Sequence, residues 1–263
     1  MKLLLALSLV AVVAARGQTL PPEQIARVDF EQRLGASLPV NALFRDESGV
    51  PVRFAQFFGQ RPVVLALVYY ECPNLCTVVL NGMLESLRDV RQSVGSDFDV
   101  VVVSIKPGDS PALAAGKKHT YTMRYGRPGS ASGWHFLTGD APAIQQLSET
   151  VGFHYVFEPQ SKQYAHASGI VVITPQGKVS RYFLGIEYPP KDVRLALREA
   201  SESKIGGLAS RLLLLCFHYD PHTGRYSLVI TRVMQLAGMG TVLILGIMIV
   251  RMTRQEHRRE GMP

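Results

Sequence analysis

Apolar positions along the chain follow two periods, one typical of buried strands and one typical of helices. Residues 62–70 (PVVLALVYY) and 98–105 (FDVVVVSI) are nearly continuous apolar runs, which indicates strands buried on both faces of a sheet. Between these runs, apolar residues recur every three or four positions from Val79 to Val94, which predicts a helix packed on that sheet. Because short loops join strand, helix and strand, we expect a crossover unit and a parallel pair.

The same alternation continues towards the middle of the chain. Ser110 and Pro111 fit the cap and the first position of a helix that runs to about Tyr125. Residues 140–152 repeat this order of cap, proline and helix, and residues 134–139 are predicted to form a short strand between the two helices.

A hairpin and a terminal helix complete the pattern. Residues 169–185 hold two β-type runs joined through a turn at 175–177, and residues 190–203 predict a last helix. A parallel core, an antiparallel hairpin and a terminal helix follow one another in this order in a thioredoxin-like fold. The predicted fold class is therefore α/β and thioredoxin-like, a central mixed sheet flanked by helices, with one C-terminal transmembrane helix in addition.

Both ends of the chain are apolar and lie outside the domain pattern. Residues 1–17 combine Lys2 with an uninterrupted apolar stretch and small residues at the end, which predicts a cleaved secretory signal peptide, with an uncleaved anchor as the alternative. Residues 233–250 carry no charge over eighteen positions, roughly 27 Å of helix and enough to cross a bilayer core. A buried helix of the domain is the weaker alternative for that stretch.

Charge gives an orientation for the predicted span. The chain has a formal net charge of +7, and in residues 251–263 four arginines against two glutamates leave +2. The positive-inside rule then places this tail in the cytoplasm and the main domain on the periplasmic or extracytoplasmic side of an inner membrane. The remaining charge is scattered, without the basic and aromatic patch of a nucleic-acid surface, so we expect no nucleic-acid partner.

These patterns divide the chain into consecutive segments. The predicted order is a signal peptide (1–17), an extended lead-in (18–34), a thioredoxin-like domain (35–205), a membrane-proximal segment with a β-hairpin (206–232), a transmembrane helix (233–250) and a basic cytoplasmic tail (251–263).

Candidate chemistry centres on two of the three cysteines, where a predicted strand gives way to a predicted helix. In ECPNLC, Cys72 follows the strand and Cys76 lies one helical turn further on the same face. A helix N-terminus lowers the pKa of a thiol and favours the thiolate, which binds soft metals such as Cu(I) or zinc. The same thiols could form a disulfide in an exported protein, so metal binding, redox exchange and a structural bridge all stay open.

A metal site needs a further ligand, and His166 is the best placed of the seven histidines. It stands before the predicted hairpin strand, in what we expect to be a loop that crosses in front of the cysteine-bearing helix. A lone histidine is often structural, so the residues alone leave the ligand and the structural interpretation balanced.

Three stretches resemble the Sco/SenC family, namely YYECPNLC, SIKPGDSP and YAHASGIVVITPQGKVSRY, and the similarity covers roughly residues 35–205. The members of this family are thioredoxin-fold copper chaperones of respiratory cytochrome oxidase. The resemblance implies that Cys72, Cys76 and His166 bind one copper ion per chain, as Cu(I), Cu(II) or both. It also implies delivery of that copper to the copper-receiving subunit of a terminal cytochrome oxidase during assembly.

The chain departs from the family pattern at several positions. Thr77 stands where the family often has proline, Ala165 where it often has aspartate, and Lys106 where it often has the aspartate of an Asp-Pro pair. None of these changes removes a ligand, although the missing acid beside the histidine is expected to alter copper affinity or partner recognition. The family is usually anchored at its N-terminus, whereas this chain is predicted to be anchored at its C-terminus.

A thiol-disulfide reductase is the main alternative function, because the cysteine pair could keep the copper-ligand cysteines of the oxidase reduced. Such reductases usually have two residues between their cysteines, whereas three residues separate Cys72 from Cys76 here. A peroxiredoxin would need threonine where Tyr69 stands, and a tail of thirteen residues after Val250 is short for the output domain of a sensor. Glu71 and Asp109 could form an acid–base pair, but as exposed carboxylates near a helix N-terminus they are expected to contribute only favourable electrostatics.

The third cysteine, Cys216, forms a Cys-x-His-x3-His set with His218 and His222 that could hold a second metal. However, YDPHTG fits a tight turn between two β-prone runs, so a hairpin explains the segment without a metal. We favour the structural interpretation.

Overall fold

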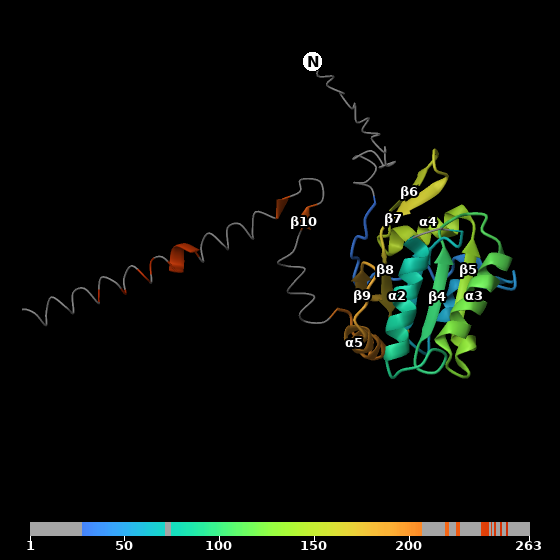
Figure 1. Cartoon of the computed structure of the whole chain (residues 1–263), viewed down its shortest axis with the longest axis horizontal. Helices are drawn as coiled ribbons and strands as arrows, with labels where there is room; N and C mark the ends of the chain where they lie inside the picture. The colour runs from blue at the N-terminus through green and yellow to red at the C-terminus, as the bar shows by residue number, and fades with distance from the viewer. Residues whose placement is uncertain are drawn as a thin grey trace, which may run out of the picture.

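A seven-stranded mixed sheet, with strand order β2-β1-β5-β4-β3-β8-β9, organises the chain (Figure 1). The computed structural model describes residues 28–71 and 75–206, and near the C-terminus residues 219–220, 225–226, 238–241, 243, 245, 248 and 251.

The centre of the sheet is the predicted parallel core. Strands β3 (Val63–Val68) and β4 (Asp99–Ser104) pair in parallel, and β5 (Trp134–Gly139) pairs in parallel with β4. Every residue of β3 and β4 is buried, which explains why both strands are continuous apolar runs in the sequence.

Antiparallel strands extend the sheet at both edges. The predicted hairpin is formed by β8 (Gly169–Ile173), which pairs with β3, and β9 (Val179–Leu184). At the other edge, β1 (Leu43–Arg45) pairs with β5, and β2 (Pro51–Arg53) pairs with β1. These two strands were not predicted, because three residues are too few for an alternating pattern to stand out.

A separate two-stranded hairpin was also missed. It consists of β6 (Tyr155–Glu158) and β7 (Gln163–His166), which pair in an antiparallel arrangement. In Figure 1 this hairpin projects from the sheet beside α4.

The helices lie largely where they were predicted. Their bounds are Leu75–Asp89 for α2, Pro111–Tyr125 for α3, Ala141–Thr150 for α4 and Pro190–Ser201 for α5, with 3-10 turns η1 (Phe54–Phe57) and η2 (Ser130–Gly133). In Figure 1, α2 and α3 lie side by side across the sheet. One bound differs: α2 ends at Asp89, although the apolar spacing runs on to Val94, which is buried as part of the following turn.

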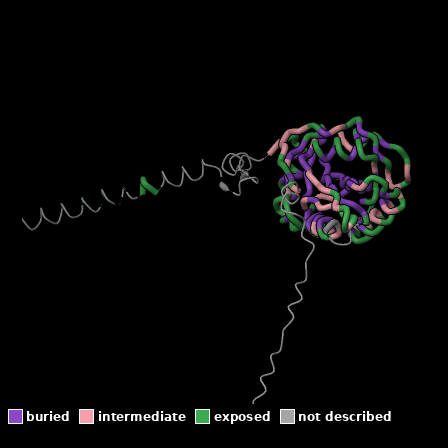
Figure 2. Tube along the Cα trace, turned by 90° about the horizontal axis from the view of Figure 1, so that it is seen from above, coloured by how far each residue is buried: buried purple, intermediate pink, exposed green. Residues whose placement is uncertain are grey.

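The core lies between the helices and the sheet, where buried positions concentrate (Figure 2). Trp134 is fully buried, with its ring 5.6 Å from that of Tyr125 and 6.4 Å from that of Phe136 between centroids. The described part of the predicted lead-in also joins this core. Phe30 is buried and forms an isolated β-bridge with Phe153.

Little of the C-terminal region is described. Two short strands, β10 (Tyr219–Asp220) and β11 (Arg225–Tyr226), pair in an antiparallel arrangement. Among the described residues, no helix combines the length and the apolar character needed to cross a membrane. Most of residues 233–250 lie outside the described residues, so the predicted span stays a prediction.

Candidate metal centre

Three segments that are far apart in the sequence meet at one end of the sheet. Because β3 and β4 are parallel and Val68 is in register with Ser104, the residues that follow both strands leave the sheet together. The Ile105 amide donates to the carbonyl of Val68 at 2.7 Å just beyond the strand ends. Strand β8 runs antiparallel to β3, so the segment that enters β8 lies at this same end.

The two cysteines belong to the first of these segments. Cys72 lies outside the described residues, and Cys76 is the second residue of α2, with only its backbone described. Among the side chains that the structure describes, no three His, Cys, Asp or Glu groups come close enough to hold a metal ion, and Cys72 is not among those side chains. The predicted ligand set therefore stays a prediction.

His166 belongs to the segment that enters β8. The prediction that it lies in a loop is wrong, because His166 is the last residue of β7 and is in register with Tyr155 of β6. Strand pairing over these few residues fixes the histidine at the base of the hairpin. Its side chain is buried, with 6% of the residue exposed.

The imidazole of His166 is held in a defined tautomer. Its Nδ1 lies 2.7 Å from the carbonyl oxygen of Ala167, and since a carbonyl only accepts, Nδ1 carries the proton and donates. The lone pair then belongs to Nε2, as in many metal-binding histidines. Burial lowers the pKa of His166 below its ordinary value, although the bond to Ala167 acts in the opposite direction. The fixed tautomer and the net lowering of the pKa suit a neutral imidazole that can bind a metal through Nε2.

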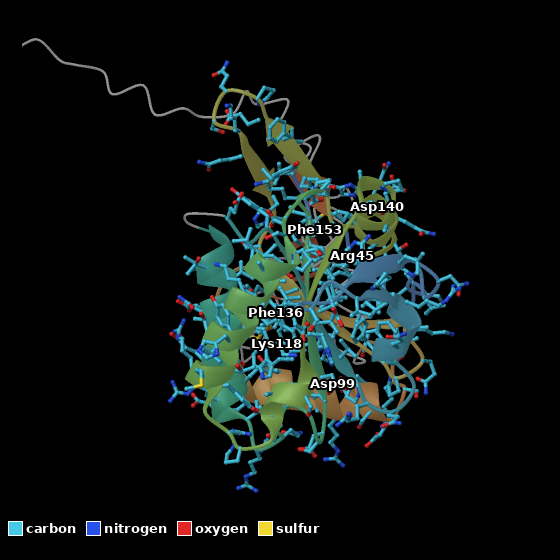
Figure 3. All side chains as sticks on the ribbon, turned by 90° about the vertical axis from the view of Figure 1, so that its right-hand side faces the viewer. Arg45, Asp99, Lys118, Phe136, Asp140 and Phe153 are labelled. Carbon is cyan, nitrogen blue, oxygen red and sulfur yellow. The ribbon has the colours of Figure 1, made fainter. Side chains whose placement is uncertain are left out.

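An aromatic contact links His166 to the cysteine segment. The ring of Tyr69, three residues before Cys72, lies 6.1 Å from the imidazole between centroids, and the ring of Phe153 lies 5.7 Å from it. Figure 3 shows Phe153 towards the β6–β7 hairpin and Asp99, the first residue of β4, towards the opposite end of the sheet. His166 therefore lies at the end of the sheet from which the cysteine segment departs.

The loop after β4 also contacts the cysteine segment. The carboxylate of Asp109 is fully buried, not exposed as the sequence suggested. Its Oδ2 accepts from the Tyr70 amide at 2.9 Å and from the Ser104 hydroxyl at 2.7 Å. Because the carboxylate is buried and already accepts two hydrogen bonds, Asp109 has a structural role, which is to hold the cysteine segment. It is not the exposed half of an acid–base pair.

Lys106, in the loop after β4, contacts two carboxylates, one in its own loop and one in the cysteine segment. Its Nζ lies 3.5 Å from Oδ1 of Asp109 and donates a hydrogen bond to the carboxylate of Glu71, the residue before Cys72. This bond to Glu71, together with the charge of Asp109, raises the pKa of Lys106 above its ordinary value. The sequence gave no signal for these contacts beyond the departure from the family pattern at position 106, because Tyr70 and Asp109 are 39 positions apart in the sequence.

Cys216, His218 and His222 lie outside the described residues, so the second metal set stays a prediction. His135 lies on β5 with its ring 4.7 Å from that of Phe57, and burial lowers its pKa to about 4. His154 lies 3.6 Å from the carboxylate of Glu31 at the surface.

The mixed sheet with a parallel core, the flanking helices and a cysteine-bearing helix that begins after the first core strand define a thioredoxin-like α/β protein. A family model described as SCO1/SenC matches residues 41–201, more than half of the 263 residues. The chain belongs to the SCO1/SenC family, as the resemblance of its motifs predicted.

Solved structures share the fold at low sequence identity. A protein of Aquifex aeolicus VF5 matches with a TM-score of 0.57 and 20% identity, over 65% of this chain and 95% of that chain. Arabidopsis thaliana ScoI, solved with copper bound, matches with a TM-score of 0.51 and 13% identity, over 65% and 99%. BsSco, described as a member of the Sco family of cytochrome c oxidase assembly proteins with a disulfide switch, matches with a TM-score of 0.50 and 20% identity, over 67% and 100%. A comparison with curated proteins gave no match.

Proposed function

We propose that this protein is a copper chaperone that binds one copper ion through Cys72, Cys76 and His166. It would deliver that copper to the copper centre of a respiratory cytochrome oxidase during assembly. The observation that carries the proposal is the buried, tautomer-fixed His166 at the end of the sheet from which the cysteine segment departs. Membership of the SCO1/SenC family, the copper in Arabidopsis ScoI and the assembly role named for BsSco support it.

The chemistry of the three groups suits copper as cargo. Two thiolates and one neutral imidazole give soft and borderline ligands, which bind copper in either oxidation state. The start of α2 favours the thiolate form of a cysteine in its first turn. Delivery would proceed by ligand exchange, in which thiolates of the acceptor replace those of the chaperone one at a time, so that no bare copper ion forms.

The proposed location of the domain at the membrane would support the delivery of copper. We propose that the domain lies on the periplasmic or extracytoplasmic side of the inner membrane, attached by a helix at residues 233–250. Such an attachment would keep the copper ligands near the membrane, where an oxidase subunit presents its own exposed domain.

The test is copper binding by the full-length protein, fully reduced and loaded with Cu(I) under anaerobic conditions. We expect one tightly bound copper with sulfur and nitrogen ligation in the X-ray absorption spectrum. The variants Cys72→Ser, Cys76→Ser and His166→Gln should each lose tight binding. His135→Gln, which replaces a largely buried histidine on β5, and Cys216→Ser are the matched controls and should bind as the parent does.

Two results would overturn this assignment. Binding that survives His166→Gln with unchanged ligation would remove the histidine from the site. A second equivalent of tightly bound copper that disappears in Cys216→Ser would show that the set of Cys216, His218 and His222 binds metal, contrary to our preference for a hairpin there.

The disulfide switch named for BsSco favours a second candidate function, a thiol-disulfide reductase that keeps the copper-ligand cysteines of the oxidase reduced. His166 separates the two candidates, because a reductase needs both cysteines and has little need of the imidazole. Oxidase maturation in cells that carry His166→Gln should fail for a chaperone and proceed for a reductase.

A further inference from the structure

We propose that Lys106 is a positioning residue for the cysteine segment, which it holds by binding Glu71 and Asp109 at once. The inference rests on the proposed function, since it concerns the same copper ligands. It assigns a role to a residue that departs from the family pattern and that contributes no ligand of its own.

The buried partner of Lys106 is Asp109. Asp109 has no exposed side-chain surface, and its Oδ2 accepts hydrogen bonds from Tyr70 and Ser104. Within the described part of the chain, Oδ1 is buried and accepts no hydrogen bond, and the ammonium of Lys106 at 3.5 Å is the cation paired with it. A buried carboxylate is costly unless a positive charge compensates it, so Asp109 depends on Lys106.

The exposed partner of Lys106 is Glu71. Lys106 has 34% of its side chain exposed and donates to Glu71, whose side chain is 52% exposed. An ion pair this accessible adds little to stability. Its effect is local, because Glu71 is directly followed by Cys72 in the sequence.

The two contacts act on adjacent residues of one segment. Asp109 holds the backbone of Tyr70, and Lys106 holds both Asp109 and the side chain of Glu71. The segment that leads from β3 to Cys72 is thus fixed from the β4–α3 loop, on the same stretch where Tyr69 contacts His166. Loss of Lys106 is therefore expected to loosen this stretch and to weaken copper binding at the proposed site.

A second ion pair of the fold provides a matched control. Arg61 and Asp99 lie 3.3 Å apart, with side chains 31% and 12% exposed, and Asp99 begins β4 at the opposite end of the sheet. Removal of Arg61 also leaves a largely buried carboxylate without its cation, but far along β4 from the cysteine segment.

The experiment compares Lys106→Met, Lys106→Arg and Arg61→Met in the full-length protein. Cu(I) affinity is measured by competition with a chromophoric Cu(I) chelator, and amide exchange at Tyr70 is measured on the metal-free protein by NMR. For Lys106→Met we expect the dissociation constant of Cu(I) and the exchange rate at Tyr70 each to rise about tenfold. Lys106→Arg, which keeps a cation able to bind both carboxylates, should restore both quantities to within about threefold.

Arg61→Met should lower the melting temperature but leave Cu(I) affinity and exchange at Tyr70 unchanged. Parental exchange at Tyr70 in Lys106→Met, or an equal loss of affinity in Arg61→Met, would overturn the positioning role. The exchange measurement needs no copper, so it remains decisive even if the parent protein binds none. In that case the proposed function fails and the positioning of the segment is judged separately.

Discussion

Helices α2 and α3 both have fifteen residues and lie side by side, yet different kinds of contact fix them in place. The ends of α3 are fixed by its own sequence. The Ser110 hydroxyl accepts from the Leu113 amide, Pro111 occupies the first turn, and Gly126 ends the helix in a left-handed conformation with φ of 72°.

Helix α2 is fixed by contacts from elsewhere in the chain. The guanidinium of Arg127 donates to the carbonyls of Arg88, Val90 and Gln92 at 2.8, 2.6 and 2.7 Å, and so binds the end of the helix and the turn after it. In the middle of α2, Gly82 lets the segment after β9 approach closely. An added Cβ there would lie 1.9 Å from the carbonyl oxygen of Ile186.

This difference between α2 and α3 shows how a helix with a functional residue in its first turn can be held in position. Local caps are enough to form a helix, but they do not fix its position relative to a sheet. The middle and the C-terminal end of α2 are located by tertiary contacts, so its first turn, which contains Cys76, starts from a fixed place.

The largest expected effect comes from exchanging the glycines of the two helices for alanine. Gly82→Ala should destabilise the protein by about 3 kcal/mol, because the methyl group collides with backbone that must move. Gly116→Ala, in α3, meets nothing within 4 Å and should leave stability unchanged or raise it by up to about 1 kcal/mol. Urea unfolding of the full-length variants measures both, and equal effects would refute the contrast between the helices.

A smaller effect is expected at the end of α2. Arg127→Ala removes several charged hydrogen bonds to carbonyls and should cost about 2 kcal/mol. Arg127→Lys keeps the charge but not the fork of donors, so its loss should fall between parent and alanine variant. Thermal unfolding gives the order, and a lysine variant as stable as the parent would mean that the positive charge and its cation–π contact with Tyr125, at 5.2 Å, matter and the fork of hydrogen bonds does not.

The smallest expected effect is a dependence of stability on pH, which arises from His135 on the α3 side of the sheet. Burial, followed by the charge of Lys118 on α3, lowers the pKa of His135 from 6.5 to about 4. Between these values the unfolded chain binds more protons, so the contribution of this residue is complete above pH 6.5 and is lost as the pH falls towards 4. Allowing for partial exposure, we expect a loss of about 1–2 kcal/mol.

The variant His135→Gln isolates this term, because burial shifts the pKa of His166 in the same direction and His166 remains in both proteins. The difference in unfolding free energy between parent and variant should change between pH 6.5 and 4 and stay constant above. A difference independent of pH would show that His135 titrates normally.

Sequence patterns predicted what local interactions determine. The bounds of α3 follow from its cap, proline and final glycine, and the buried runs at residues 62–70 and 98–105 became parallel strands. The end of α2 was placed too late, since the apolar spacing continues to Val94 while Arg127 binds carbonyls near Asp89. That contact is invisible in the local sequence.

The candidate site divides in the same way. The cysteine pair was predicted from its motif and spacing, and His166 from its place before the hairpin strand and from the family resemblance. The strand that holds the histidine was not predicted, because QYAH has no alternating apolar pattern. The link from Lys106 to Glu71 and Asp109 depends on the register of two parallel strands, which only the folded chain reveals.

Trp134 is the single tryptophan of the chain, and its place in the core has an optical consequence. Its indole is buried on the side of the sheet that α3 covers, next to the rings of Tyr125 and Phe136, so its emission should be blue-shifted in the native state and should move to longer wavelength only when that part of the core opens. Fluorescence therefore provides a built-in reporter of the α3 side of the molecule, with which signals from the proposed copper site can be compared.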